Sequence, residues 1–217
     1  EVTATTDGPM ADFIGTMRGT GSGFAVGPDL VVTNFHVAGK ATAMAVRTKD
    51  GRRVAATVLT ALAQDDLVLL RVHDVELMPL TLADAPIDVG ARTWAIGAPM
   101  GLEYSLTEGI ISGQRDIAGT PFLQMQTTVA PGSSGGPLLN DRAEVVGVNT
   151  AVASPGLSLA VAIERVQALL LLERDEAALP LPLLPEPIKL VHVDTPQDMV
   201  PTARQGVEEL LNALIGQ

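Results

Sequence analysis

The chain has 217 residues, enough for one large or two small domains, and it is 47% hydrophobic, 18% charged and 3% aromatic. Its net charge of −11 argues against a site for nucleic acid or an anionic membrane surface, and the lack of cysteine excludes disulfides and thiolate chemistry. The 21 glycines and 15 prolines predict many turns, which suits short strands around an aliphatic core.

Short strands account for the first half of the sequence. Residues 1–11 are polar, and we expect them to form a poorly ordered lead-in. Asp50-Gly51 separates two segments rich in Ala, Val and Thr, which predicts a β-hairpin. The strands predicted in this half cover residues 19–26, 30–32, 41–49, 52–60 and 67–72.

A proline-containing stretch at residues 78–88 predicts a link to a second half of the same kind, in which Asn140-Asp141 predicts another hairpin turn. Short strands with turn signals every eight to twelve residues or so favour a sandwich or barrel, so we expect an all-β fold without βαβ units. The strands predicted here cover residues 92–96, 109–114, 123–127, 137–139, 144–149 and 157–161.

The C-terminal sequence predicts helices and a linker. Apolar residues at helical spacing predict a helix over residues 163–176. Residues 177–217 contain a proline-rich linker and an amphipathic segment, which we expect to pack on the domain, with docking of a partner as the alternative. No apolar run reaches the roughly 18 residues of a membrane-spanning helix, and no signal peptide is evident. Because the chain opens at Glu1 rather than Met, an upstream signal or anchor stays open.

Glycines surround two serines at residues 132–136, Gly-Ser-Ser-Gly-Gly. A serine hydroxyl becomes a strong nucleophile only when a base takes its proton and N–H groups stabilise the oxyanion. The glycines permit such a tight loop, so Ser134 is the candidate nucleophile and Gly132, Ser133 and Ser134 the candidate oxyanion loop. The N–H groups of Gly132 and Ser134 are the expected donors. Alone, the motif fits an ordinary Gly/Ser turn equally well.

The same residues also match the G-x-S-x-G nucleophile elbow of α/β-hydrolases. That elbow needs a helix after the serine, with Asp and then His later in the chain. Here Ser134 precedes a hairpin, and the only later histidine, His192, lies beyond the proline-rich linker. The order therefore argues against an α/β-hydrolase esterase.

His36 and Asp66 are the candidate partners of the serine. His36 follows an apolar strand, and histidine suits a general base because it titrates near neutral pH. Asp66 directly precedes the strand at 67–72, where a carboxylate could orient the imidazole, and Asp65 is the less favoured alternative. Considered alone, a histidine or an aspartate in such a position more commonly has a structural role than a catalytic one. We assign that structural role to His73 and His192.

Seven motifs follow one another along about residues 17–170: Gly21-Ser22-Gly23-Phe24, Thr33-Asn34-Phe35-His36-Val37, Asp66-Leu67-Val68-Leu69-Leu70, Gly97-Ala98-Pro99-Met100-Gly101, Gly109-Ile110-Ile111-Ser112, Gly132-Ser133-Ser134-Gly135-Gly136 and Val146-Gly147-Val148-Asn149-Thr150. Together they resemble the trypsin-like serine proteases and, within them, the HtrA/Deg family.

This resemblance implies two six-stranded antiparallel β-barrels with a C-terminal helix: a protease domain at residues 12–176, with the barrels at about 12–78 and 88–162. It implies a serine endopeptidase that needs no cofactor or metal, in which Ser134 attacks, His36 acts as base and Asp66 orients the imidazole. Polypeptide substrates, protein quality control or regulatory proteolysis, and a periplasmic or otherwise extracytoplasmic location are implied too. A cytoplasmic location and homo-oligomerisation stay open.

The resemblance also suggests a substrate pocket. Thr128, six positions before the nucleophile, should lie in the first pocket, with Leu157, Ser158 and Leu159 as the opposite wall. None is charged, so we expect cleavage after small or medium aliphatic residues rather than after Lys or Arg. The alternative is that these are ordinary strand residues.

The chain departs from the HtrA/Deg pattern in two respects. Ser133 stands where that family usually has Asn, and we expect activity to survive, because the backbone of this residue shapes the loop. No PDZ-like pattern follows in residues 177–217. A latent enzyme or a non-catalytic peptide-binding module on the same scaffold is the alternative function.

Overall fold

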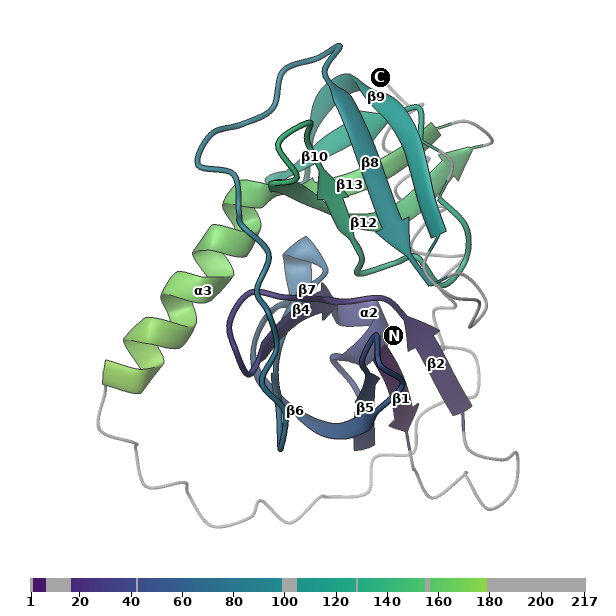
Figure 1. Cartoon of the computed structure of the whole chain (residues 1–217). Coiled ribbons are helices and arrows are strands. Elements are labelled where there is room, and N and C mark those ends of the chain that lie inside the picture. The colour runs from purple at the N-terminus through teal and green to yellow at the C-terminus, as the bar shows by residue number, and fades with distance from the viewer. Residues whose placement is uncertain are drawn as a thin grey trace, which may run out of the picture.

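Two antiparallel β-sheets, one from each half of the chain, make up most of the computed structural model (Figure 1). The structure describes residues 2–6, 17–41, 43–98, 105–127, 129–154 and 157–178. The predicted all-β organisation in two halves is therefore confirmed. Residues 179–217, which make up almost all of the predicted tail, lie outside the described residues.

The N-terminal sheet has seven strands in the order β2-β1-β5-β6-β7-β4-β3. It curls without closing, whereas we expected a six-stranded barrel in this half (Figure 1). The strand at one edge, β3, has only two residues and pairs with β4 alone. The strands are β1 Val2–Thr6, β2 Met17–Gly21, β3 Phe24–Ala25, β4 Leu30–Asn34, β5 Ala43–Arg47, β6 Arg53–Leu62 and β7 Leu67–Val72.

The expectation of a poorly ordered lead-in is wrong for Val2–Thr6, which forms β1 between β2 and β5. Val2 is fully buried and lies opposite Gly21 on one side and Val46 on the other. Threonine and valine favour strands despite the polarity of threonine, so this polar segment completes the sheet.

The hairpin predicted at Asp50-Gly51 is confirmed, since it joins β5 to β6 with Arg47 opposite Arg53. Gly51 has a φ of 85°, a conformation that glycine adopts without steric cost. The N–H of Gly51 donates to the carbonyl of Thr48 over 3.0 Å, which closes the turn.

The C-terminal sheet is a closed barrel of six strands in the order β10-β13-β12-β11-β8-β9. The hairpin predicted at Asn140-Asp141 joins β11 to β12, as expected. The barrel strands are β8 Arg92–Gly97, β9 Ser105–Ile117, β10 Thr120–Met125, β11 Pro137–Leu139, β12 Val145–Ser154 and β13 Leu157–Ala162.

Helix α3, Ile163–Ala178, starts at the predicted residue and runs along the side of both sheets (Figure 1). Its residues Ile163, Val166 and Leu169 are almost completely buried. They share one apolar cluster with residues of both halves: Phe24, Val32, Leu67, Leu69, Phe122, Val145, Val148, Leu159 and Val161. The helix thus connects the two sheets through its packing. Within the described residues, no helix has the length and hydropathy that crossing a membrane requires.

Replacing Leu169 by alanine tests this packing. We expect Leu169→Ala to lower the free energy of unfolding by about 2–5 kcal/mol, because Leu169 is fully buried and its loss leaves a cavity. Leu171→Ala on the same helix is the matched control, since Leu171 is 59% exposed, and should cost roughly 0.5 kcal/mol or less. Urea unfolding measures both values, and equal costs would contradict the packing role.

Candidate active site

The two sheets bring His36, Asp66 and Ser134 to their junction. His36 lies in the short helix α2, Phe35–Ala38, directly after β4, and Asp66 lies between the 3-10 turn η1, Ala63–Asp65, and β7. Because β4 and β7 are antiparallel neighbours with Asn34 opposite Leu67, the end of one strand meets the start of the other. Ser134 comes from the loop before β11 of the C-terminal barrel.

The Asp66 carboxylate holds the histidine with both oxygens. Oδ2 lies 2.7 Å from Nδ1 of the His36 ring, and Oδ1 accepts the backbone N–H of His36 over 2.9 Å. With Nδ1 as donor to the carboxylate, a neutral ring presents an unprotonated Nε2, which is the form of a general base. Asp65, the alternative considered from sequence, makes no contact with His36 and binds Arg165 instead.

Thr150 on β12 connects the carboxylate to the serine. Its hydroxyl donates to Oδ2 of Asp66 over 2.6 Å, and its carbonyl accepts the hydroxyl of Ser134 over 3.2 Å. The sequence gives no sign of this role, because Thr150 stands 84 residues after Asp66 and its motif suggests only a strand. The structure does not join Ser134 to the His36 ring by a hydrogen bond, as the serine hydroxyl is directed to Thr150.

The oxyanion loop begins with a turn over Ala130-Pro131-Gly132-Ser133, in which the N–H of Ser133 donates to the carbonyl of Ala130 over 3.0 Å. Gly132 has a φ of 97°, and Pro followed by such a Gly is the sequence of a type II turn. Among the described residues, the N–H groups of Gly132 and Ser134 have no hydrogen-bond acceptor, so both are available to a ligand oxygen. Ser133 itself is 7% exposed.

Gly135 allows this loop to approach the N-terminal sheet. It has a φ of 87°, and a Cβ at this position would lie 2.2 Å from the carbonyl oxygen of Ser22. The N–H of Gly135 donates to the carbonyl of Asn149 over 2.8 Å. Only glycine fits this conformation and this space, which accounts for the glycine after the serine.

Ser22 fastens the loop to the N-terminal sheet. Its N–H donates to the carbonyl of Ser134 over 2.7 Å, and its hydroxyl donates to the carbonyl of Gly132 over 2.8 Å. The same hydroxyl accepts the N–H of Ala98 over 2.9 Å. Ser22 is 4% exposed, so its N–H and its hydroxyl depend on these contacts. The sequence marked this residue only as part of a glycine-rich motif.

The predicted substrate pocket stays a prediction. Thr128 lies outside the described residues, and Leu157 is half-buried on β13. The hydroxyl of Ser158 donates to the carbonyl of Thr127 over 2.8 Å, so this hydroxyl already has a hydrogen-bond partner within the protein. Leu159 is 1% exposed and belongs to the apolar cluster shared by both halves.

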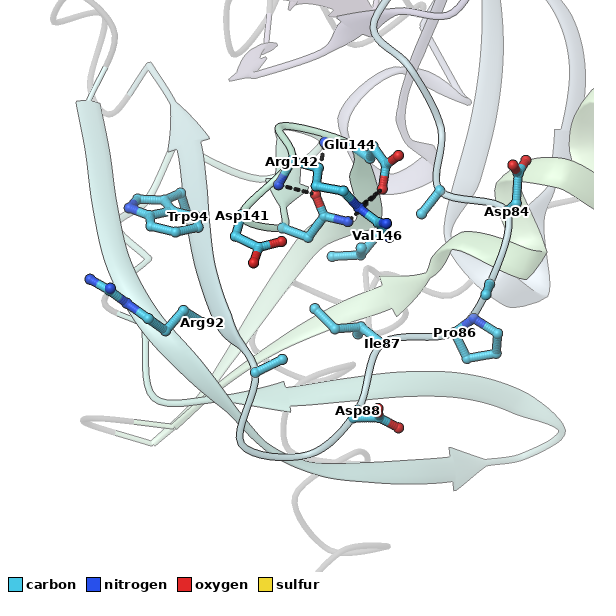
Figure 2. A pocket seen from close by; sticks show the side chains of 14 residues that line it. Asp84, Pro86, Ile87, Asp88, Arg92, Trp94, Asp141, Arg142, Glu144 and Val146 are labelled. Carbon is cyan, nitrogen blue, oxygen red and sulfur yellow. Dashed lines mark hydrogen bonds and ion pairs between the residues drawn. The ribbon is translucent and has the colours of Figure 1, made fainter.

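A cavity of about 540 Å³ lies elsewhere, on the C-terminal barrel. Figure 2 shows it between the chain at Asp84–Asp88, strand β8 with Arg92 and Trp94, and the turn at Asp141–Glu144. The residues that line this cavity do not include His36 or Ser134, so it is separate from the candidate active site.

A sequence model of the trypsin-like peptidase domain matches residues 21–148. A probable periplasmic DegP-like serine endoprotease of Halomonas elongata is 38% identical over 159 residues, which cover 68% of this chain and 33% of that protein. A putative serine protease, HhoB, of Synechocystis is 36% identical, over 69% of this chain and 39% of that protein. The chain thus matches only about a third of the length of these relatives.

Solved structures show the same fold. The active form of the Rv3671c protease of M. tuberculosis has a TM-score of 0.67 at 26% identity and covers 78% of both chains. Its inactive form has a TM-score of 0.64 at 25% identity, with 78% of this chain and 87% of that chain covered. These matches confirm the expected chymotrypsin/trypsin-like fold and the resemblance to HtrA/Deg proteases.

Replacing Ser22 by alanine tests how the loop is held. We expect Ser22→Ala to lower the free energy of unfolding by about 1–3 kcal/mol, because the N–H of Ala98 and the carbonyl of Gly132 lose a buried partner. Ser112→Ala is the control, since Ser112 lies apart from the loop and is less buried than Ser22, and its hydroxyl donates to the carbonyl of Gln124 over 3.3 Å and accepts the side-chain amide of Gln124 over 3.1 Å. Thermal and urea unfolding measure both, and a Ser22→Ala variant as stable as the wild type would contradict the role of Ser22.

Proposed function

This chain belongs to the trypsin-like peptidase domain family, with relatives of the HtrA/DegP type, and on that premise we propose that it is a serine endopeptidase with Ser134, His36 and Asp66 as its catalytic triad. One observation carries the proposal. The Asp66 carboxylate binds Nδ1 of His36 from the N-terminal half and accepts the hydroxyl of Thr150 from the C-terminal barrel, beside the loop that carries Ser134.

In the proposed reaction, Ser134 Oγ first leaves the carbonyl of Thr150 by a change of χ1 rotamer. Nε2 of His36 takes its proton while Oγ bonds to the scissile carbonyl carbon, and Asp66 stabilises the resulting imidazolium. His36 then protonates the amine as the C–N bond breaks, which leaves an acyl-enzyme. Water, activated by His36, releases the acyl group and restores Ser134.

The turn at Pro131-Gly132 supports a loop that can accept an oxyanion. Proline sets the φ needed at the second residue of a type II turn, and glycine tolerates the positive φ at the third. The backbone N–H groups of Gly132 and Ser134 would donate to the negative oxygen, where one such donor contributes roughly 10²–10³ in rate.

One observation favours the second candidate, a latent or non-catalytic peptide-binding module. Ser134 donates to Thr150 rather than to His36, which is the arrangement of a resting site.

Two further proposals concern the location of the protein and its cleavage preference, and both depend on the resemblance to relatives. The Halomonas relative is named a probable periplasmic serine endoprotease, so we place this protein outside the cytoplasm, with polypeptide substrates in protein quality control or regulatory proteolysis. Cleavage after small or medium aliphatic residues follows from the uncharged pocket positions.

Labelling with a fluorophosphonate tests the triad. We expect covalent labelling of the wild type at Ser134, found by peptide mass mapping at about pH 8, because a serine reacts in this way only when a base activates it. Ser134→Ala should abolish the label, and His36→Ala should slow it by about 10³-fold or more. A folded wild type without label would favour the latent or peptide-binding alternative.

Substitutions of Thr150 test the connection to Asp66. Thr150→Val removes the hydroxyl but keeps the shape and the backbone carbonyl, so Oδ2 of Asp66 loses a donor at 2.6 Å. We expect the labelling rate to fall by about tenfold or more, because a hydrogen bond to a charged group contributes about 1.5–3 kcal/mol and about 1.4 kcal/mol corresponds to a factor of ten in rate. Thr150→Ser keeps the hydroxyl and is the matched control. Equal rates for the two variants would argue against this role of the hydroxyl.

A further inference from the structure

Asp65 is a buried carboxylate that the proposed reaction does not use. Its side chain is 7% exposed. Oδ2 accepts two hydrogen bonds from Arg165, from Nε over 2.9 Å and from Nη2 over 2.5 Å. Oδ1 accepts the hydroxyl of Thr120 over 2.5 Å. A carboxylate is rarely buried unless it is paired, and here both oxygens have partners.

The three partners belong to three different parts of the fold. Asp65 ends η1 beside the N-terminal sheet, Thr120 begins β10 of the C-terminal barrel, and Arg165 lies in the first turn of α3. The chain separations are 55 residues to Thr120 and 100 residues to Arg165. The contacts therefore fasten the turn before Asp66 to the half of the molecule that carries Ser134.

The backbone of Asp66 adds a reason for such an anchor. It has φ 54° and ψ 39°, the left-handed region, which aspartate adopts more readily than most residues other than glycine but still at a conformational cost. The turn is short, and the N–H of Asp66 reaches the carbonyl of Ala63 only over 3.3 Å. The carbonyl of Asp66 accepts the backbone N–H of Phe35, at the start of α2, and the side-chain amide of Asn34, at the end of β4.

On the other side, the turn is tied to the C-terminal half through the side chains of Asp65 and Asp66. A shift of the turn relative to β12 would disturb both the bond from Thr150 to Asp66 and the orientation of His36. The guanidinium of Arg165 opposes such a shift, because both of its bonds to Asp65 depend on one planar orientation.

We propose that Asp65 and Arg165 are positioning residues, which fix the turn that presents Asp66 and so align His36 with Ser134. Helix α3 is then a required part of the active unit rather than only a cover for the core. The proposal rests on the proposed function for its effect on rate, whereas its effect on the His36–Asp66 hydrogen bond can be measured independently.

The main variant is the double substitution Asp65→Asn with Arg165→Gln. It removes both charges at once, so no unpaired charge is left buried. The matched control is Arg142→Gln with Glu144→Gln, which removes another arginine–carboxylate ion pair, at 3.1 Å in a hairpin of the C-terminal barrel. Circular dichroism tests whether both variants fold.

The first measurement is the rate of fluorophosphonate labelling of Ser134 from about pH 5 to pH 9. We expect the double variant to react about 10- to 100-fold more slowly, the scale of a small misplacement of reacting groups. Its acid limb should move to lower pH, because a loosened Asp66 stabilises the imidazolium of His36 less. The control should keep the wild-type rate and acid limb. A purely structural role would lower the melting temperature and leave the acid limb unchanged.

The second measurement is the proton NMR signal of the His36 Nδ1–H, which lies far downfield when it is held in a short bond to a carboxylate. His36→Gln assigns the signal. We expect it in the wild type and in the control, and expect it shifted upfield or lost in the double variant. This readout needs no activity, so it still tests the proposal if the wild type takes no label and the proposed function fails.

A folded double variant with the wild-type rate, acid limb and proton signal would overturn the proposal, and so would an equal loss in the control. Arg165→Lys adds a milder test, since lysine keeps the charge without the planar pair of donors. The labelling rate, acid limb and His36 proton signal of Arg165→Lys should lie between those of the wild type and the double variant. If the double variant does not fold, the same measurements are made on Arg165→Lys alone. Values equal to those of the wild type would then overturn the proposal.

Discussion

The Asp66 carboxylate is the point on which the arrangement of the site depends. It receives the backbone N–H and the ring of His36 from its own sheet and the hydroxyl of Thr150 from the other sheet. A carboxylate that accepts several donors in a partly buried place has a fixed direction, because each lost bond would leave charge poorly solvated. The sheets must therefore keep one relative placement, and the apolar cluster they share with α3 supplies it.

Two different kinds of contact maintain that placement. The apolar cluster opposes separation of the halves but allows small sliding movements, because its contacts have little directional preference. The hydrogen bonds of Ser22 and Asp65 are directional and lie on either side of the site, one at the oxyanion loop and one at the turn before Asp66. Packing thus holds the halves together, and these polar contacts set their alignment.

The elements that could be predicted from sequence are those with local causes. Asp50-Gly51 and Asn140-Asp141 form the expected hairpins, and α3 begins at Ile163, because turn chemistry and helical spacing act over a few residues. The pairing of His36 with Asp66 also agrees with the motifs. What escaped prediction depends on distant partners: Ser22 lies 110 residues from Gly132, and Thr150 lies 84 residues from Asp66. Strand β1 is not predicted because the polar residues at 1–11 suggest a poorly ordered segment. In the structure, β1 pairs with strands on both sides and Val2 is buried.

The two adjacent aspartates show why sequence alone separates their roles poorly. Asp65 and Asp66 have the same side chain in the same turn, and either could precede a buried strand. The left-handed backbone of Asp66 turns successive side chains toward different surroundings, one toward His36 and one toward Arg165. The partner then decides the chemistry. A carboxylate fully occupied by a guanidinium and a hydroxyl has no free oxygen for an imidazole, whereas one bound to a histidine and a threonine can respond when the ring gains a proton.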